Sequence, residues 1–313
     1  TLTNAQFSTP IQQDPLKPAH FLIAGQEIME TNSGYDASCA IPTCLLVYTS
    51  KLWTQAYDLG AGNSTTALDL VGEDMYAGYC SNCYLVDGAP FATGIATNAV
   101  SGKWRKAAHI GLPARDVTSI RMDPGNRSTV YVTLAAYLPR YVPGGRIPDA
   151  PDGGTGHVYK STDAGEHFTD ITGNLPNAPA NWSLVHDGHL VVATDLGVFV
   201  STDTNGGSYG VLGANLPAVP VMTLRMQPGS NDRMIAATFG RGVYSFCFSG
   251  ASCPASTVPA TPTTPAVLDM LPPTASARIA APAGALAVVA AIALLVLGRR
   301  RRRASGHLFE GPA

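Results

Sequence analysis

Charged residues are scarce in this sequence, since Asp, Glu, Lys and Arg together make up 13% of its 313 residues. That is about half the usual share, and it suits an exported β protein better than a cytosolic helical one. Helical periodicity is also missing before Ile279. Nucleophile elbows, phosphate loops and dinucleotide fingerprints are absent as well. Nothing in the sequence therefore favours the enzyme classes that those motifs serve.

Basic residues are sparse in most of the chain. Residues 1–277 hold 14 Lys and Arg against 21 Asp and Glu. The other six basic residues are Arg278 and the run Arg299–Arg303. Nucleic-acid binding needs clustered Lys and Arg side chains that contact phosphates, and residues 1–277 are acidic overall. We therefore expect no nucleic-acid partner.

The sequence also lacks an initiator Met and a signal peptide at its start. Thr1 leads directly into strand-like sequence. Exported proteins carry such a leader before cleavage. The prediction is that the natural chain begins further upstream and that these residues are its C-terminal portion.

One long apolar run is present near the C-terminus. Ile279–Gly298 is a stretch of 20 residues without a charge, and at about 1.5 Å per residue it spans about 30 Å, the thickness of a hydrocarbon core. Arg299–Arg303 follow at once and resist translocation. Residues 279–298 are predicted as a single transmembrane helix and 299–313 as a basic cytoplasmic tail. The alternative is a buried core helix.

A short motif precedes this run, in the order Leu271, Pro272, Pro273, Thr274 and Ala275. With the apolar segment and the arginines, it resembles the sorting signal of Gram-positive surface proteins in its LPxTA variant. The resemblance implies cleavage after Thr274 and attachment of that residue to peptidoglycan. The alternative is a plain Pro-rich linker before a retained membrane helix. Residues 251–278 are predicted as an extended linker, because six Pro and five Thr fall within residues 254–274.

The remaining body is repetitive. Ser119-Ile-Arg-Met-Asp-Pro-Gly matches Thr223-Leu-Arg-Met-Gln-Pro-Gly, and a short apolar strand follows each copy. Five strands of this type align on Ala24, Ala77, Thr133, Ala193 and Ala237, with spacings of 53, 56, 60 and 44 residues. Repeats of this length, each with several short strands and turns, indicate propeller blades.

The predicted fold is therefore an all-β propeller of four-stranded blades of about 50 residues, covering residues 1–250. Neighbouring blades must supply each other's core, because one blade cannot cover both faces of its sheet. Five units are recognisable, at residues 7–57, 64–105, 116–168, 182–209 and 219–246. A β-helix or a sandwich is the alternative.

Residues Ser161-Thr-Asp-Ala-Gly-Glu-His-Phe168 resemble the Asp-box of BNR-type propellers. That superfamily includes sialidases, xyloglucanase-type glycoside hydrolases and sortilin-like receptors. Asp163 can accept hydrogen bonds from the turn backbone, Gly165 can adopt a positive φ, and Phe168 can pack into the blade. These roles are structural rather than catalytic. Related propellers usually close with six to eight blades, which supports missing blades upstream.

The six cysteines form three close pairs: Cys39 with Cys44, Cys80 with Cys83, and Cys247 with Cys253. In an extracellular protein, local disulfides are the default expectation. The first two pairs could instead form a four-thiolate zinc site. We expect disulfides, and neither a metal nor a cofactor.

The expected binding face is the mouth of the central channel, where inner strands and loops converge. Polar residues just after those strands include Glu27, Asp195 and Arg241. A glycosidase needs two carboxylates at a defined separation, and Asp69 and Asp74 are further candidates, but no spacing singles out a pair. The catalytic residues, if any, stay unknown.

Two other sets of residues have structural explanations. Arg121 and Arg225 occupy equivalent positions in the repeats, which favours a role in the blades over a role in substrate binding. His186 and His189 resemble a metal pair, but the Asp-Gly between them is typical of a hairpin turn.

Together these patterns predict an extracellular binding module at the cell envelope, anchored in the membrane or to the wall, whose ligand is a carbohydrate or a protein. The alternative is a glycoside hydrolase, sialidase-like or xyloglucanase-like, with catalytic residues partly in missing N-terminal blades.

Overall fold

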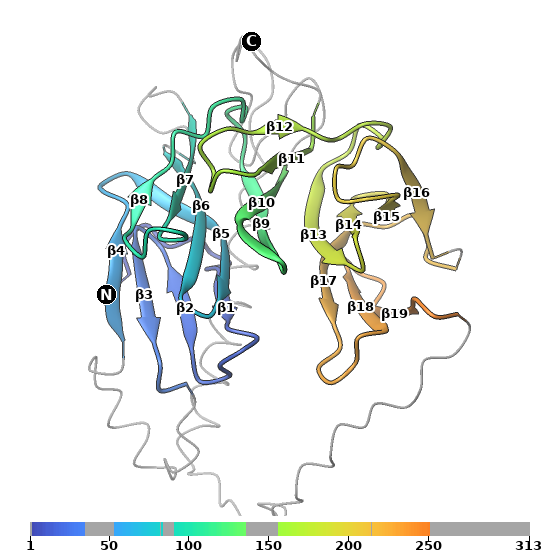
Figure 1. The fold of residues 1–313 in the computed structure, drawn as a ribbon, viewed down its shortest axis with the longest axis horizontal. Helices are drawn as coiled ribbons and strands as arrows, with labels where there is room; N and C mark the ends of the chain where they lie inside the picture. Colours follow the sequence, from blue (N-terminus) through green and yellow to red (C-terminus); the bar gives the residue numbers. More distant parts are fainter. Residues whose placement is uncertain are drawn as a thin grey trace, which may run out of the picture. The chain divides into compact units, whose positions relative to one another are not determined.

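The computed structural model describes residues 2–34, 53–81, 83, 91–135, 156–213 and 215–250. Within these ranges the regular secondary structure is entirely β, with 19 strands and no helix (Figure 1). All of these residues belong to one compact unit, Thr1–Thr257. The prediction of an all-β fold is confirmed.

The strands form five antiparallel sheets, which follow one another along the chain and are called blades 1 to 5. Blade 1 consists of β1 (Ile11–Gln13), β2 (Phe21–Ala24), β3 (Glu27–Thr31) and β4 (Thr54–Asp58). Blade 2 consists of β5 (Asn63–Val71), β6 (Asp74–Ser81), β7 (Ala92–Thr97) and β8 (Arg105–Lys106).

Blades 3 and 4 repeat this four-stranded meander, and blade 5 has three strands among the described residues. Blade 3 consists of β9 (Val117–Asp123), β10 (Asn126–Leu134), β11 (Val158–Ser161) and β12 (Thr169–Asp170). Blade 4 consists of β13 (Ala180–His186), β14 (His189–Thr194), β15 (Gly197–Ser201) and β16 (Tyr209–Leu212). Blade 5 consists of β17 (Val221–Met226), β18 (Arg233–Thr238) and β19 (Val243–Cys247).

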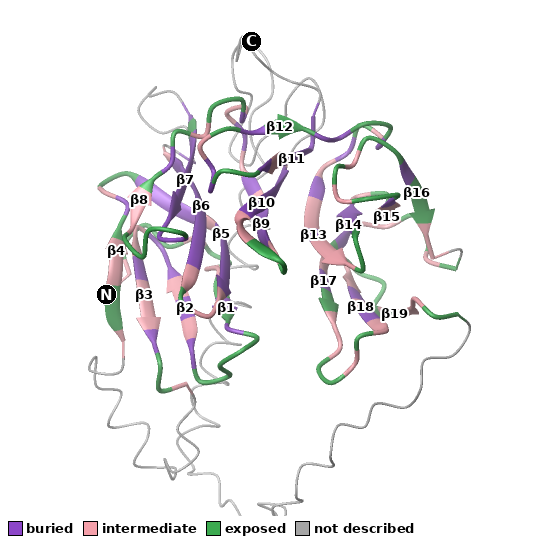
Figure 2. Ribbon diagram, in the orientation of Figure 1, coloured by how far each residue is buried: buried purple, intermediate pink, exposed green. Residues whose placement is uncertain are grey.

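The repeated strand of the sequence has the same place in every blade. The five aligned residues lie in β2, β6, β10, β14 and β18, which are the second strands of the five sheets. These strands carry the most apolar sequence because they lie inside their sheets and are covered on both faces; β14, for example, has five consecutive buried residues (Figure 2). The repeat therefore identified one structural position five times.

The hydrophobic cores lie between consecutive blades. Leu22 and Ile28 of blade 1 pack with Leu70 of blade 2. Buried side chains of blade 2 continue into the next cluster, in which Ile95 packs with Ile120 of blade 3. Two further clusters join blade 3 to blade 4 and blade 4 to blade 5. Each sheet thus uses its neighbours to cover its apolar faces, as stacked repeats require.

The first strands of the blades meet at the centre of this unit. β5 contacts β9, β9 contacts β13, and β13 contacts β17. Side chains near the starts of these strands donate hydrogen bonds to the next blade. Thr118 Oγ1 of β9 donates to Ala180 O of β13, and Asn181 Nδ2 of β13 donates to Val221 O of β17. The end of the unit where these first strands begin is called the entry end below.

Several predicted features lie outside the described residues. They are the 279–298 segment, the arginine run, the sorting motif with Leu271, Pro272, Thr274 and Ala275, and the cysteines Cys39, Cys44 and Cys253. Among the residues that the structure describes, no helix is long and apolar enough to cross a membrane.

Candidate functional site

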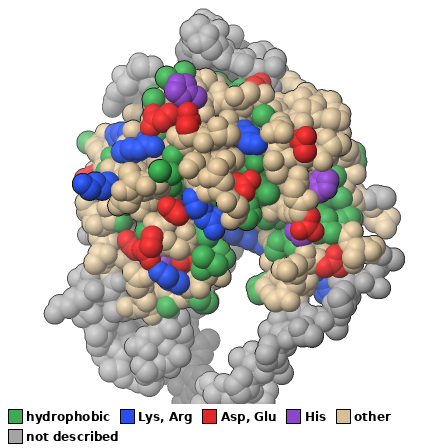
Figure 3. Space-filling model, viewed as in Figure 1, with side chains coloured by type: hydrophobic (Ala, Val, Ile, Leu, Met, Phe, Trp, Pro, Cys, Tyr) green, Lys and Arg blue, Asp and Glu red, His purple; other side chains and the backbone are tan. Residues whose placement is uncertain are grey.

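A cluster of side chains at the centre, here called the central cluster, draws one residue from the first strand of every blade. Its members are Gln12 of β1, Asp69 of β5, Arg121 of β9, Trp182 of β13 and Arg225 of β17. The cluster combines two guanidinium groups, one carboxylate, one amide and one indole. Over the face drawn in Figure 3, basic and acidic side chains are interspersed and do not gather into a patch of one sign.

Asp69 and Arg121 form a buried ion pair between blades 2 and 3. Arg121 Nη1 lies 2.6 Å from Asp69 Oδ1, and the two side chains are 9% and 6% exposed, respectively. The backbone N–H of Met122 donates to Asp69 Oδ2 at 2.7 Å. Both carboxylate oxygens are therefore engaged, and Asp69 serves to join the two blades.

The indole of Trp182 lies against both arginines. The guanidinium carbon of Arg121 is 4.0 Å from the centre of the Trp182 ring, and that of Arg225 is 4.7 Å from it. Such contacts attract a cation to the electron-rich face of the ring. Gln12 connects the two arginines, because its Oε1 accepts from Arg225 Nη2 at 3.1 Å and lies 3.4 Å from Arg121 Nη1. The Gln12–Arg225 hydrogen bond joins blade 1 to blade 5.

Arg225 is the accessible member of the arginine pair. It is exposed, whereas Arg121 is buried and Trp182 is half-buried. Surrounding protein lowers the pKa of Arg225 to about 10, and repulsion by Arg121 adds to this, while Asp69 acts in the opposite direction. Arg225 therefore stays a cation at neutral pH, in a place where one carboxylate faces two guanidinium groups.

The three residues predicted for the channel mouth have separate surroundings. Glu27 begins β3 and accepts hydrogen bonds from the backbone N–H and the hydroxyl of Thr3, each at 2.7 Å. Burial raises its pKa, but these bonds outweigh that effect and leave the pKa below its ordinary value. Asp195 follows β14 and accepts from Asn181 Nδ2 at 2.9 Å. Arg241 is exposed in the turn between β18 and β19.

The sequence reasoning missed two titratable groups at the entry end of blade 3. Asp116 precedes β9, and burial raises the pKa of its carboxyl to about 6. His157 precedes β11, and burial lowers its pKa, as does the nearby Arg115. Asp116 Oδ1 and His157 Nδ1 are buried without a hydrogen-bond partner. Neither residue stands in a motif, so only the three-dimensional environment marks them.

The end of β10 lies between the backbones of Asp116 and His157 and forms a hydrogen bond with each. The N–H of Ala135 donates to Asp116 O, and the N–H of Leu134 donates to His157 O, both at 2.9 Å. On its other side, His157 Nε2 lies 3.0 Å from Asn177 Oδ1. At the entry end of blade 3, the pKa of a carboxyl is thus raised and that of an imidazole is lowered. Both shifts favour the neutral form of the group.

The Ser161–Phe168 turn connects the last two strands of blade 3. Ser161 Oγ accepts the N–H of Gly165 at 2.9 Å, and Asp163 Oδ1 accepts the N–H of His167 at 3.0 Å. Gly165 has a φ of +86°, and Phe168 is buried in the core shared with blade 2. Burial raises the pKa of Asp163, but bonds from His167 and Ser161 outweigh it and hold the pKa at about 2. These contacts hold the turn together.

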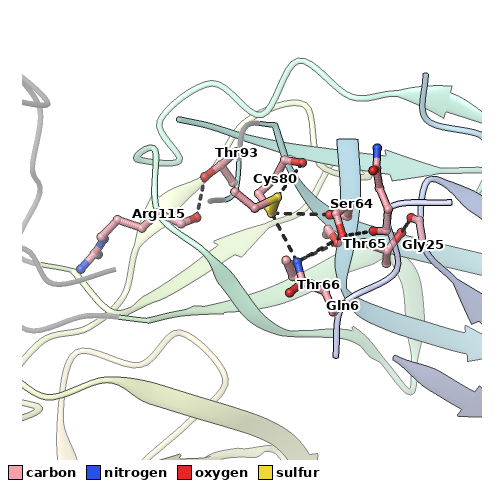
Figure 4. The surroundings of a disulfide bond; sticks show 11 residues. Gln6, Gly25, Ser64, Thr65, Thr66, Cys80, Thr93 and Arg115 are labelled. Carbon is pink, nitrogen blue, oxygen red and sulfur yellow. Dashed lines mark hydrogen bonds between the residues drawn. A yellow bond between two sulfur atoms is a disulfide. The ribbon is translucent and has the colours of Figure 1, made fainter. Parts of the chain in front are cut away.

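One of the three cysteine pairs lies within the described residues. Cys80 at the end of β6 forms a disulfide with Cys83. This bond leaves no thiolate at these two positions for the zinc alternative. Gln6 Nε2 donates to Ser64 Oγ at 3.1 Å and lies 3.9 Å from Cys80 Sγ, so the side chain of Gln6 contacts the disulfide (Figure 4).

The two histidines of blade 4 flank a hairpin turn. His186 and His189 are paired at the end of β13 and the start of β14, with Asp187 and Gly188 both at positive φ between them. The ring of His186 stacks on Phe248, with 4.0 Å between ring centroids, and His189 Nδ1 lies 2.9 Å from Ser201 O. Both rings therefore have structural contacts.

No protein-family model and no curated protein matches this sequence. Solved structures do. An ancestral GH74 enzyme aligns with a TM-score of 0.50 at 12% identity, covering 80% of this chain and 31% of that chain. For the GH74 enzyme of Niastella koreensis the TM-score is 0.49 at 14% identity, with 80% and 32% coverage. For the GH74 xyloglucanase of Xanthomonas campestris the TM-score is 0.45 at 14% identity, with 76% and 36% coverage.

These comparisons concern the fold. The likeness with a TM-score of 0.50 supports a fold of the β-propeller type, in agreement with the successive four-stranded sheets. The chain spans about a third of the length of these GH74 proteins. At identities of 12–14%, the likeness does not extend to particular residues.

Proposed function

We propose that this protein is a binding module that takes a carbohydrate ligand at the central cluster. The observation that carries the proposal is the position of Trp182 and Arg225, which remain accessible where the first strands of all five blades meet. Sugar-binding sites combine an aromatic surface with a few fixed hydrogen-bond donors, and this pair supplies both. The ancestral GH74 enzyme with a similar fold makes a carbohydrate a reasonable choice of ligand.

Binding is favoured over hydrolysis at this place. Glycoside hydrolysis needs two carboxylates with separate roles. The central cluster contains one, Asp69, and both of its oxygens already accept from Arg121 and from the backbone of Met122. A carboxylate held in this way is unsuited to act as an acid, a base or a nucleophile. The cluster can bind and orient a ligand without transforming it.

The test is retention of the full chain by polysaccharides in affinity electrophoresis. Xyloglucan, arabinoxylan, pectin and soluble peptidoglycan fragments form a suitable set. Trp182→Ala should abolish retention by whichever glycan slows the wild type. Trp53→Ala, which removes a half-buried indole just before β4, is the matched control and should leave retention unchanged. Equal retention of Trp182→Ala and wild type would overturn the assignment to the central cluster.

The proposal includes display on the outer side of the cell envelope. It is supported by the apolar 279–298 segment followed by five arginines and by the LPxTA-like motif with Thr274. The Pro/Thr-rich linker would hold the blades away from the membrane. Thr274→Ala should prevent release of the protein together with cell-wall fragments after muramidase digestion. Unchanged release would leave membrane anchoring by the apolar segment as the mode of display.

Glycoside hydrolysis is the second candidate function, and Asp116 is the observation that favours it. A general acid needs a raised pKa, and burial raises that of Asp116 to about 6. Asp195, at the entry end of blade 4, is the candidate partner carboxylate. Release of reducing sugars by the wild type, lost in Asp116→Asn, would establish this function. Release that persists in Asp116→Asn, or no release from any glycan in the set, would remove Asp116 from consideration.

A further inference from the structure

The central cluster holds more positive than negative charge. Arg121 and Arg225 face the single carboxylate of Asp69, and Gln12 and Trp182 are neutral. Asp69 is committed to Arg121 at 2.6 Å. The guanidinium of Arg225 is therefore the charge that lacks a counter-ion within the cluster.

The guanidinium of Arg225 also has unused donors. Among the described residues, its hydrogen-bond partner is the neutral Gln12, through Nη2 at 3.1 Å. The group has five N–H donors in a planar fork, which suits bidentate contact with a carboxylate or a sulfate. The contact with the Trp182 ring, 4.7 Å from the guanidinium carbon, and the hydrogen bond to Gln12 restrict this group, so less conformational freedom is lost when an anion binds.

The buried arginine shows that the cluster as a whole is short of acceptors. Arg121 is buried, and its Nε has no hydrogen-bond partner. Repulsion between the two arginines contributes to the lowered pKa of Arg225. An anion placed beside Arg225 would reduce this repulsion and would supply the missing negative charge.

We propose that the ligand of the central cluster is an acidic glycan, whose carboxylate or sulfate group pairs with Arg225 beside the indole of Trp182. The inference rests on the proposed carbohydrate-binding function and specifies the chemical class of the ligand. A neutral glycan could contact the accessible part of the half-buried indole, but it would leave the charge of Arg225 uncompensated in a partly desolvated place. Selectivity for acidic over neutral glycans is therefore the property that the cluster should confer.

Isothermal titration calorimetry of the full chain provides the test. The probes are a trigalacturonate, a chondroitin sulfate tetrasaccharide, a neutral xyloglucan oligosaccharide of similar size, and inorganic sulfate alone. At least one acidic oligosaccharide should bind about tenfold or more tightly than the neutral one, since charge-assisted hydrogen bonds are the stronger class. Raising the ionic strength should weaken the acidic but not the neutral interaction. The carboxylate and sulfate probes distinguish the two sources of charge.

Three variants distinguish an effect of the Arg225 charge on binding from an effect on folding. Arg225→Gln should remove the preference for the acidic oligosaccharide while leaving the melting temperature close to that of the wild type, because the residue is exposed. Arg225→Lys should retain most of the preference. Arg127→Gln makes the same charge change in β10, where its Nη1 donates to Asp123 O, and serves as the matched control. It should bind like the wild type.

The outcomes separate this inference from the function on which it rests. Equal affinity for acidic and neutral oligosaccharides, both reduced in Trp182→Ala, would overturn the acidic-ligand inference and keep the carbohydrate-binding proposal. A preference for acidic probes that persists in Arg225→Gln would place the anion elsewhere and would also overturn it. Binding of inorganic sulfate without any oligosaccharide would contradict both proposals.

Discussion

Two acidic residues show how burial assigns different roles to the same side chain. Asp69 is buried with a partner for each oxygen, so its charge is balanced and it joins two blades. Asp116 is half-buried, and its buried Oδ1 has no hydrogen-bond partner, so its proton is held more tightly. The first arrangement stabilises the fold, and the second leaves a carboxyl oxygen that has no structural hydrogen bond.

For Asp69, we predict that Asp69→Ala lowers the free energy of unfolding by about 3–5 kcal/mol, because it leaves the charge of Arg121 buried without its carboxylate. Urea denaturation at neutral pH measures the change. Asp74→Ala, at the half-buried start of the paired strand β6, should change stability by less than about 1 kcal/mol. Similar losses in both variants would mean that the Asp69–Arg121 ion pair contributes no more to stability than the half-buried Asp74 does.

For Asp116, the raised pKa predicts a dependence of stability on pH. The carboxyl titrates near 3.8 in the unfolded chain and at about 6 in the folded protein. The folded state binds the extra proton between these values, so its contribution to stability is present below pH 3.8 and is lost as the pH rises through 6. Asp116→Asn should therefore raise the free energy of unfolding by up to about 3 kcal/mol at pH 8.

The same variant should match the wild type near pH 3.5, where both side chains are neutral. Chemical denaturation at the two pH values provides the comparison. A gain of the same size at both pH values would show that packing, and not ionisation, is responsible. A loss at pH 8 would mean that the carboxylate has a compensating partner.

At the scale of the element, the Ser161–Phe168 turn depends on backbone conformation. Gly165 has a φ of +86°, and a Cβ there would lie 3.3 Å from Ala107 Cβ and from Ile95 Cγ2. Gly165→Ala should lower stability by about 1–2 kcal/mol, the cost of a left-handed residue with a side chain. Gly210→Ala, in β16 with no atom within 4 Å, is the control and should be nearly neutral. Equal effects in a thermal melt would contradict this account.

Strand positions were predictable from the sequence because the second strand of every blade meets the same physical demand. It must be apolar on both faces, and this produced the repeat around Ala24, Ala77, Thr133, Ala193 and Ala237. Outer strands such as β8 and β12 have two residues each and few buried side chains, so they leave a weaker pattern. Hairpin turns with glycine at positive φ were also readable, as at Gly165 and Gly188.

The central cluster was less readable. Arg121 and Arg225 were noticed as equivalent repeat positions and interpreted as blade structure, which holds for the buried Arg121. Gln12 and Trp182 share no motif with them, and these four residues span positions 12 to 225, so their convergence follows only from the packing of first strands. Asp116 was missed because a raised pKa depends on desolvation, which no spacing in the sequence encodes.

At the scale of the whole unit, stability comes from cores shared between blades. Leu224 of β17 is fully buried against side chains of blade 4 such as Val191 and Val198. Leu224→Ala should therefore lower the free energy of unfolding by about 2–5 kcal/mol. Met222 on the same strand is 48% exposed, and Met222→Ala should cost less than about 1 kcal/mol. Comparable losses in denaturation would indicate that blade 5 does not depend on blade 4.

The convergence of first strands on one accessible cluster is the central claim of this account, and hydrogen exchange with mass spectrometry tests it most directly. Exchange of the full chain would be compared with and without the polysaccharide that retains it most strongly. Peptides from β13 and β17, which carry Trp182 and Arg225, should gain protection on binding, and Trp182→Ala should abolish that gain. Protection confined to outer strands such as β12 and β16, with β13 and β17 unchanged, would contradict it.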